Sequence, residues 1–376
     1  MHWRARVVAG AAVAAVAAAL VLTVVITRDD TSAGVEAGGD GPPARPATSA
    51  TTSGPPSSVT TSTTNPRGSG KPVTLAFAGD VHFEGELRGK LAADPGSVLG
   101  PIAPVLAAAD LAVVNLETAI TERGEPAPKR YTFRAPASAF TALAAAGVDV
   151  ASMANNHGLD YGPVGLEDSL TAAALSGFPV IGIGRDAAQA YAPYGTVIDG
   201  QRIAVLAATQ VLDGNLVEAW TATDTRPGLA SAKEVDRLVA AVAEARATSD
   251  TVVAFLHWGI EKQECPSAAQ QELARRLVSA GADVVVGGHA HRLQGAGRLD
   301  GALVAYGLGN FAFYAKPGPA ATSGVLLVTV TGREVDAYEW RPAVIRGGVP
   351  YPLEGEEAAA AVARWDGLRG CAGLER

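Results

Sequence analysis

The stretch that most constrains the fold of this chain is ADVVVGGHAHRLQG, residues 282–295. It opens with an uninterrupted apolar run rich in valine, which predicts a buried strand. Two glycines follow, and His289 and His291 then stand two positions apart. Because α/β proteins place their chemistry in loops that leave buried strands, these two imidazoles are candidate metal ligands. For this motif alone, the alternative is a pair of solvated loop histidines.

The same order, an apolar run and then side chains that can bind metal, recurs along the chain. Of the six histidines, all but His2 lie within a few residues of the end of a predicted strand. Taken singly, each motif also fits a surface carboxylate, an Asx turn or a helix cap. Four further runs follow this order: residues 73–78 precede Asp80 and His82, 111–114 precede Glu117, 148–153 precede Asn156, His157 and Asp160, and 251–256 precede His257 and Glu261.

Strand ends in a doubly wound or sandwich α/β fold converge on one rim, and this convergence predicts a shared site. The nitrogen and oxygen ligands suffice for two adjacent dications, and a set of carboxylates and imidazoles suits Mn, Fe or Zn. Two ions about 3.5–4 Å apart can neutralise the charge that develops when a phosphoester is displaced in line. The sequence therefore predicts a dinuclear metal site.

Hydrophobic periodicity predicts helices at residues 136–146, 163–176, 232–247 and 268–280. Further strands are expected at 179–183, 195–198, 203–208, 303–307, 324–331 and 335–345. The last two strands have no helix between them, so they are expected to pair antiparallel. The end of the chain is expected to be helical and peripheral.

The N-terminal part of the chain predicts a membrane anchor. Residues 7–26 include only Thr23 as a clearly polar side chain, and at about 1.5 Å per residue they span roughly 30 Å, the thickness of a bilayer core. Arg4 and Arg6 precede this run and two aspartates follow it, so the positive-inside rule places the rest of the chain outside the cell membrane. A cleaved signal peptide and a secreted protein are the alternative.

The composition after this run predicts a tether and then a globular domain. Residues 31–70 are mostly Gly, Pro, Ser, Thr and Ala, and such a segment cannot bury enough apolar surface to offset the entropy of ordering. The expected organisation is an anchor or signal segment at 1–27, a disordered linker at 28–72, a globular domain at 73–345 and a peripheral C-terminal segment at 346–376.

The formal net charge of −8 argues against nucleic acid and anionic lipid as main partners. One loop nevertheless carries Lys129, Arg130 and Arg134, which either steer an anionic substrate or form an ordinary solvated loop. The two cysteines, Cys265 and Cys371, can form one disulfide outside the membrane, but the sequence leaves their pairing open.

The chain contains six motifs in this order: GDVH, NLE, NNHGLDYG, HWGIE, GGHAHRLQ and YGLGNF. In order and spacing, the set resembles the CapA family of bacterial poly-γ-glutamate capsule-synthesis proteins. The resemblance covers about residues 73–314, most of the expected globular domain. It implies a calcineurin-like metallophosphoesterase fold, a two-sheet α/β sandwich. It also implies a membrane anchor with the globular domain outside the cell.

The resemblance further implies a role for each candidate residue, with two divalent ions, Mn, Fe or Zn, as cofactors. The chain departs from the common family pattern at His82, where relatives often have Met or Leu, and at Gly288 and Ala290, where they often have His and Pro. The implied roles are as follows: Asp80, His82 and His291 hold the first ion, Asn156, His257 and His289 hold the second, Glu117 bridges them, His157 acts as an acid or as a donor to the transition-state oxyanion, and Asp160 and Glu261 complete the catalytic set.

The sequence features are compatible with three functions. The resemblance favours an anchored protein that takes part in the synthesis, export or attachment of a capsular polymer, with an anionic polymer as substrate and membrane proteins of capsule synthesis as possible partners. The second is a secreted metal-dependent phosphoesterase that acts on a nucleotide or lipid phosphate. The third is a non-enzymatic subunit that binds polymer without turnover.

Overall fold

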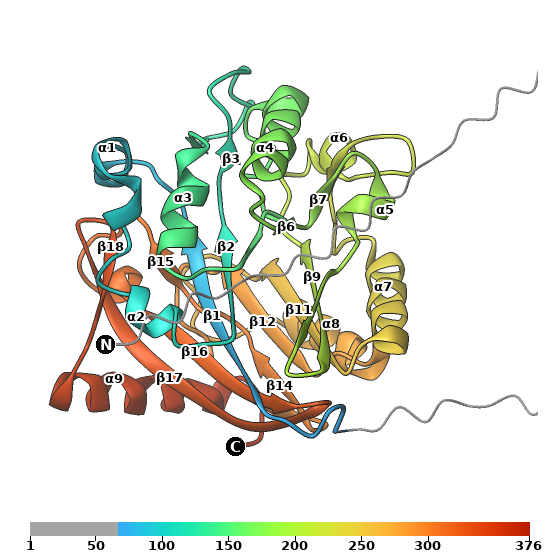
Figure 1. The fold of residues 1–376 in the computed structure, drawn as a ribbon, viewed down its shortest axis with the longest axis vertical. Coiled ribbons are helices and arrows are strands. Elements are labelled where there is room, and N and C mark those ends of the chain that lie inside the picture. Colours follow the sequence, from blue (N-terminus) through green and yellow to red (C-terminus); the bar gives the residue numbers. More distant parts are fainter. Residues whose placement is uncertain (1–66) are drawn as a thin grey trace, which may run out of the picture. The chain divides into compact units, whose positions relative to one another are not determined.

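Two β-sheets lie at the centre of the computed structural model, which describes residues 67–376 (Figure 1). The predicted anchor and nearly all of the predicted linker lie outside the described residues. Within residues 67–376, no helix is both long enough and apolar enough to cross a membrane.

The larger sheet is built around β1, which pairs in parallel with β2 and antiparallel with β16. β16 and β17 pair antiparallel, as the absence of a helix between them predicted. The end of β1 also pairs in parallel with β15. Across the sheet, the strands are β18 (Val349–Pro352), β17 (Glu334–Arg346), β16 (Thr322–Thr331), β1 (Val73–Val81), β2 (Leu111–Leu116), β5 (Val150–Ser152) and β6 (Val180–Ile181), with β15 (Asn310–Ala312) beside β1.

The smaller sheet has a parallel centre and an antiparallel hairpin at each edge. Its strands, in order, are β13 (Ala296–Leu299), β14 (Ala302–Ala305), β12 (Val284–His289), β11 (Thr251–Trp258), β9 (Gln201–Thr209) and β8 (Tyr194–Ile198). Two short pairs stand apart from both sheets: β3 (Ala119–Ile120) with β4 (Arg134–Ala135), and β7 (Ile183–Gly184) with β10 (Gly228–Leu229).

The four helices predicted before residue 281 are present as α3, α4, α7 and α8, and the expected helical end of the chain is α9. Helices α1, α2, α5 and α6 were not predicted, whereas α8 begins and ends where the sequence indicates. Its start is a capping box between Ser267 and Gln270, and its end is Gly281 in the left-handed conformation. The helices are α1 (Glu86–Ala93), α2 (Ala103–Leu106), α3 (Ser138–Ala145), α4 (Gly162–Ser176), α5 (Ala187–Ala190), α6 (Val217–Trp220), α7 (Val235–Thr248), α8 (Ala268–Ala280) and α9 (Gly355–Gly367), with 3₁₀ turns η1 (Pro95–Ser97), η2 (Pro319–Ala321) and η3 (Leu368–Cys371).

The expected single strand at 179–183 is instead two short strands, β6 and β7, which belong to different sheets. Gly182 lies between them with φ 83°, and a Cβ at this position would be 2.4 Å from the Cβ of Ala154. Only glycine fits a left-handed turn against so close a neighbour, so the chain leaves the larger sheet at this point.

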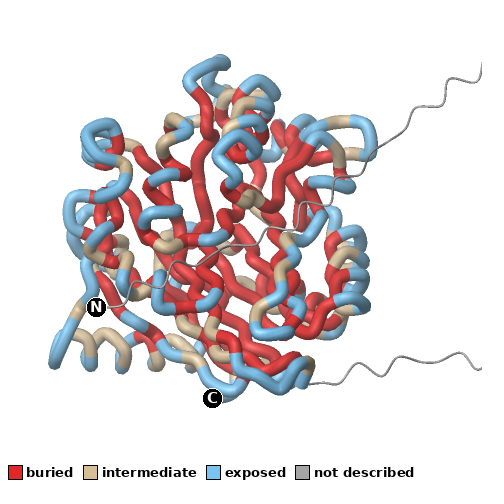
Figure 2. Tube along the Cα trace, viewed as in Figure 1, coloured by how far each residue is buried: buried red, intermediate tan, exposed pale blue. Residues whose placement is uncertain are grey.

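The two sheets face each other across a shared apolar core, and helices cover their outer faces (Figure 1). Along β1, Leu75 and Phe77 enter the core between the sheets, while Ala76 and Ala78 face α3 and α4. This division follows from the period of two in a strand. β11 divides its apolar side chains in the same way, between the core and helices α7 and α8. The trace is buried along the strands and exposed on the outer helices (Figure 2). Strands in two sheets with helices around them confirm the mixed α/β class.

The C-terminal helix α9 lies along β17 and is held there at two points (Figure 1). Trp365 is buried, and its ring stacks on that of Trp340 at a centroid distance of 5.2 Å. Beyond α9, Cys371 forms a disulfide with Cys265, so the two cysteines are paired. The helix is peripheral, as expected, but Trp365 belongs to the core between the sheets. The domain boundary expected at residue 345 stays a prediction.

Candidate metal centre

Side chains from the carboxyl ends of strands in both sheets meet at one buried position. Asp80 lies in β1 and Glu117 directly follows β2, both in the larger sheet. His257 lies in β11 and His289 ends β12, both in the smaller sheet. His291 follows two residues later. The convergence that the strand ends predicted is therefore present.

These five residues form two groups that share Glu117. Within each group, the ligand atoms all lie within 4.8 Å of one another. One group is Asp80, Glu117 and His291, and the other is Glu117, His257 and His289. This is the division that the resemblance implied for these residues, with the glutamate common to both. Their binding of an ion stays a prediction.

Asp80 is fixed by hydrogen bonds to both of its carboxylate oxygens. Its Oδ1 accepts a hydrogen bond from Nδ2 of Asn115 at 2.8 Å, and its Oδ2 accepts one from the backbone N–H of His289 at 3.0 Å. The backbone comes this close because residue 288 is glycine: a Cβ there would lie 2.3 Å from Oδ1 of Asp80. The departure from the common family pattern at Gly288 thus permits the contact between strands β1 and β12.

The histidine loop is strained in a way that serves the site. His289 has φ 86° and His291 has φ 51°, both in the left-handed region that side chains disfavour. The two ring centroids lie 5.8 Å apart. His291 Nδ1 lies 2.8 Å from Oδ1 of Asn310 and 3.3 Å from Oδ2 of Asp80. The loop is therefore not extended, as two imidazoles in one site require.

The charges around His291 determine its protonation. Burial acts to lower its pKa, but the hydrogen bond with Asp80 and the charge of Glu117 outweigh burial and raise the pKa to about 9. His289 shows the opposite balance, because burial and the nearby His291 lower its pKa to about 3. A neutral imidazole is the form that binds a metal, so His289 is ready as a ligand.

Glu117 is the most informative residue for metal binding. Its side chain is fully buried, and neither carboxylate oxygen has a hydrogen-bond partner among the described residues. Burial and then the charge of Asp80 raise its pKa well above the ordinary value. Nδ1 of His289 also lacks a partner in the described part of the chain. A divalent cation among these atoms would bond the oxygens of Glu117 and Nδ1 of His289, and it would neutralise the neighbouring carboxylates of Glu117 and Asp80. The residues therefore fit such an ion.

Asn156 lies beside His257, a member of the second group. Nε2 of His257 is 2.7 Å from Oδ1 of Asn156 and 3.5 Å from Oε1 of Glu117. The other ring nitrogen, Nδ1, is 3.0 Å from Nδ2 of Asn115. Burial, and then the neighbouring His289, lower the pKa of His257 well below its ordinary value, so the ring is neutral. Asn156 is thus where a further ligand of this group would lie.

His157 and Asp160 form a pair next to the two groups. Nδ1 of His157 lies 2.5 Å from Oδ2 of Asp160, which also accepts a hydrogen bond from the backbone N–H of Phe133 at 2.6 Å. With Nδ1 engaged, Nε2 is directed toward Glu117, at 3.8 Å from its Oε1. Burial lowers the pKa of His157 despite the hydrogen bond with Asp160. A neutral imidazole held in this way can give or take a proton at Nε2.

Lys129, which the sequence marks only as one of three cations in a loop, belongs to the site. Its side chain is 7% exposed, and Nζ lies 2.8 Å from Oδ1 of Asp160 and also bonds the backbone oxygen of Asn156. The ammonium group also lies over the ring of Trp220. An ordinary solvated loop was one of the two alternatives for the three cations, and Lys129 does not fit it because its side chain is buried. The only sequence signal was the cluster of cations, which does not distinguish Lys129 from its neighbours.

His82 and Glu261 do not belong to either group of ligands in the described chain. The His82 ring lies among aromatic rings, 3.9 Å from the centroid of Phe313 and 4.3 Å from that of Tyr314. Its Nδ1 accepts a hydrogen bond from the backbone of Glu84, and its Nε2 has no partner among the described residues. Glu261 is exposed in the loop after β11. The roles implied for both residues stay predictions.

The fold and site define a mixed α/β protein with buried carboxylates and imidazoles grouped for metal binding. The chain belongs to the PGA_cap family of bacterial capsule synthesis proteins, whose family model matches residues 74–315. This assignment confirms the CapA resemblance that the six motifs carry.

Three relatives show how far the similarity extends. The chain is 27% identical to the PGA biosynthesis protein CapA of Bacillus subtilis (strain 168), over 75% of this chain and 74% of that protein. It is 30% identical to the capsule biosynthesis protein CapA of Bacillus anthracis, over 64% and 60%. It is 29% identical to a probable polyglutamine synthesis accessory protein of Mycobacterium tuberculosis (strain ATCC 25618 / H37Rv), over 54% and 55%.

Solved structures with lower sequence identity include a hypothetical protein from Thermus thermophilus. It has a TM-score of 0.46 and 18% identity, over 73% of this chain and all of that chain. Another is a 5'-nucleotidase from Candida albicans SC5314, with a TM-score of 0.43 and 12% identity, over 78% of this chain and 56% of that chain.

Proposed function

We propose that this protein takes part in making, exporting or attaching a capsular polymer of the poly-γ-glutamate type, and that it does so through two divalent ions in a metallophosphoesterase-like two-sheet domain. The observation that carries the metal site is Glu117, a fully buried carboxylate common to both ligand groups and without a hydrogen-bond partner among the described residues. Family membership and the names of the relatives support the connection to capsular polymer.

The proposed ligands follow from the two groups. Asp80 and His291 would hold the first ion and His257 and His289 the second, with Glu117 between them; Asn156 would complete the second set, and His82 remains the proposed further ligand of the first. When bound, a divalent cation supplies Lewis-acid polarisation of an acyl or phosphoryl oxygen. Mn, Fe and Zn all suit this mixture of imidazole and carboxylate.

The protein's own acid–base group in this proposal is His157. Asp160 holds its Nδ1, so the proton moves at Nε2, on the side that faces Glu117. Lys129 holds Asp160 in turn, with its Nζ 2.8 Å from Oδ1 of that carboxylate. The same arrangement serves hydrolysis or transfer, because either reaction needs a proton given to a leaving group. Glu261 is also proposed as a catalytic residue, and its side chain is exposed in the loop after β11.

We place the protein at the cell membrane, with the domain outside and the N-terminal apolar run as its anchor, or secreted if that run is cleaved. The disulfide between Cys265 and Cys371 supports this location, because such bonds persist in oxidising compartments. The net charge of −8 supports a partner other than nucleic acid. The proposed partners are an anionic polymer or phosphoester and membrane proteins of capsule synthesis.

Elemental analysis of the full chain, purified without added metal or chelator, tests the metal site. We expect close to two equivalents of Mn, Fe or Zn, with a large loss in Asp80→Asn and His291→Ala. Asp224→Asn is the matched control, because its side chain is 80% exposed and pairs with Arg237, which belongs to neither ligand group, and it should keep the metal. A folded protein that holds no metal would overturn the dinuclear site and favour a binding subunit.

A turnover assay with the same variants tests the substrate class. The proposal would be supported if the protein shortens or transfers poly-γ-glutamate and if Asp80→Asn loses this activity. Turnover of a generic phosphoester alone, with the polymer untouched, would instead identify a plain phosphoesterase.

A further inference from the structure

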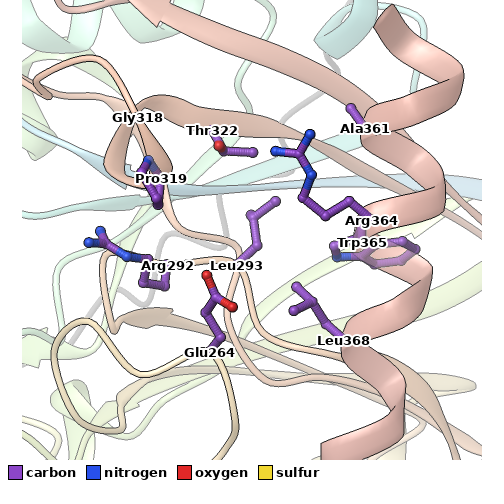
Figure 3. Close-up of a pocket in the computed structure, with 10 residues that line it drawn as sticks. All are labelled: Glu264, Arg292, Leu293, Gly318, Pro319, Thr322, Ala361, Arg364, Trp365 and Leu368. Atoms are coloured by element: carbon purple, nitrogen blue, oxygen red, sulfur yellow. The ribbon is translucent and has the colours of Figure 1, made fainter.

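A cavity of about 280 Å³ lies between helix α9, the segment that follows His291 and the start of β16 (Figure 3). None of the residues of the two ligand groups lines it. Its floor is apolar and includes Leu293 and Leu368. The cavity is therefore a separate site, although Arg292 on its wall directly follows a proposed metal ligand and donates a hydrogen bond to the backbone oxygen of His291 at 2.8 Å.

One wall of the cavity contains a buried donor without an acceptor. Trp365 is 3% exposed, and its Nε1 has no hydrogen-bond partner among the described residues. Stacking on Trp340 fixes the plane of the ring. Figure 3 shows the indole beside the cavity, next to Arg364 on the same helix. Because a buried N–H without an acceptor costs free energy, an acceptor in the cavity would be favoured.

Two side chains of opposite charge stand on either side of Leu293 (Figure 3). Arg364 extends toward Thr322, while the carboxylate of Glu264 lies on the other side of Leu293. In the part of the chain that the structure describes, neither charge forms an ion pair or side-chain hydrogen bond. The cavity thus presents donors at one end and an acceptor at the other.

The walls that carry these charges are joined covalently. Cys265 directly follows Glu264, and Cys371 ends the 3₁₀ turn after α9. Their disulfide connects the Glu264 loop to the segment that carries Arg364 and Trp365. The disulfide therefore fixes the two backbone segments from which these side chains extend, and such a constraint favours a preorganised binding site.

We infer that this cavity binds an α-amino-acid group as a zwitterion, with its carboxylate at Arg364 and Trp365 Nε1 and its ammonium at Glu264. Such a group is either a free amino acid or the amino-terminal residue of a γ-linked chain, which keeps its α-ammonium and its α-carboxylate on the same α-carbon. The choice of glutamate as the amino acid rests on the proposed function; the zwitterion site does not.

Calorimetric titration of the full chain tests the inference with free glutamate, γ-linked triglutamate and N-acetylated γ-linked triglutamate as ligands. We expect the acetylated ligand to bind at least tenfold more weakly than the free amine, because its ammonium is gone. Binding of glutamate alone would identify a free amino acid as the ligand, and binding of the triglutamate as well would identify a chain terminus. Equal binding of the amine and its acetylated form would overturn the zwitterion, and binding of neither would overturn the site.

Variants separate this cavity from a general effect on the fold. Trp365→Phe keeps the stacked ring but removes the N–H, and should weaken binding about tenfold. Tyr351→Phe is the control, because it also removes one donor from an aromatic ring, on a side chain that is 37% exposed and does not line the cavity. Equal weakening by the two changes would contradict the inference.

Charge variants assign the two ends of the ligand. Glu264→Gln should weaken the free amine about tenfold and leave the acetylated ligand unchanged, while Arg364→Gln should weaken both. Both side chains are exposed and unpaired within the described chain, so these variants should fold. Binding should persist in a chelator, so failure of the metal site and failure of this cavity give different results.

Discussion

The exchange Glu117→Gln should stabilise the metal-free protein while it removes the response to metal. Glu117 is fully buried, its two oxygens have no partners among the described residues, and Asp80 lies close enough to raise its pKa further. Glutamine has nearly the same shape but carries no charge. The Glu117 carboxylate therefore destabilises the fold when no cation is bound, and it is needed for the cation to bind.

The size of each effect follows from the burial of this side chain. Leaving a buried polar group unpaired costs about 1–3 kcal/mol, and more when it is charged. The glutamine still lacks partners, so we expect a gain of about 1–3 kcal/mol in the free energy of unfolding without metal. A metal at 100 times its Kd should stabilise the wild-type protein by about 2.7 kcal/mol, and the variant by much less.

Chemical denaturation of both proteins, with a chelator and then with saturating Mn or Zn, measures the two effects. The pH gives an internal control. Because the folded pKa of Glu117 is raised above 4.5, the carboxylate destabilises the fold increasingly as pH rises above that value. The advantage of the variant should therefore vanish below about pH 4.5. A variant that is less stable without metal and yet gains as much from metal as the wild type would refute this reasoning.

Three further predictions concern the same domain. Without metal, the histidines should narrow the stable pH range. His82, His157, His257 and His289 are buried with lowered pKa values and cost stability as pH falls below 6.5, whereas His291, with a pKa of about 9, loses its favourable charge as pH rises from 6.5 to about 9. Denaturation across pH measures this, and His291→Gln should reduce the alkaline loss to the part that Glu117 causes. Replacing both cysteines of the disulfide by Ser should lower the free energy of unfolding by up to about 4.7 kcal/mol, the chain-entropy value for a loop of about 100 residues; an unchanged denaturation midpoint would contradict it. Gly288→Ala should lose metal and about 1–3 kcal/mol of stability, because the new Cβ meets Asp80, whereas Gly214→Ala, with open space around it, should be neutral in both assays.

Strand ends were predictable because the apolar runs that precede them are short and unbroken. The run before His289 became β12, and the run before His257 became β11, which places both side chains at the same edge of one sheet. The helix α8 was predictable to the residue, since its capping box and terminal glycine are local signals. Local sequence thus specified which residues could reach the site.

Contacts made by distant residues were not predictable in this way. The ion pair of Lys129 with Asp160 depends on how a loop without periodicity folds back onto the segment that precedes α4. Trp365 lies in a helix that composition marks as peripheral, and its burial depends on how α9 packs against β17. The pairing of Cys265 with Cys371 joins residues 106 apart, which spacing alone does not reveal. These features arise from tertiary packing rather than from local pattern.

The two ligand groups share one further property, which follows from the sheet order. Each group takes Glu117 from the larger sheet, and each takes at least one histidine from β12 or β11 of the smaller sheet or from the loop that follows β12. An ion in either position would therefore bond across the core between the sheets. The strained backbone at His289 and His291 is held by the same contacts, since Asp80 of the larger sheet accepts the N–H of His289. Metal binding and the closure of one sheet on the other should consequently be coupled, which is why we expect a change at Glu117 to alter the stability of the whole domain and not only its chemistry.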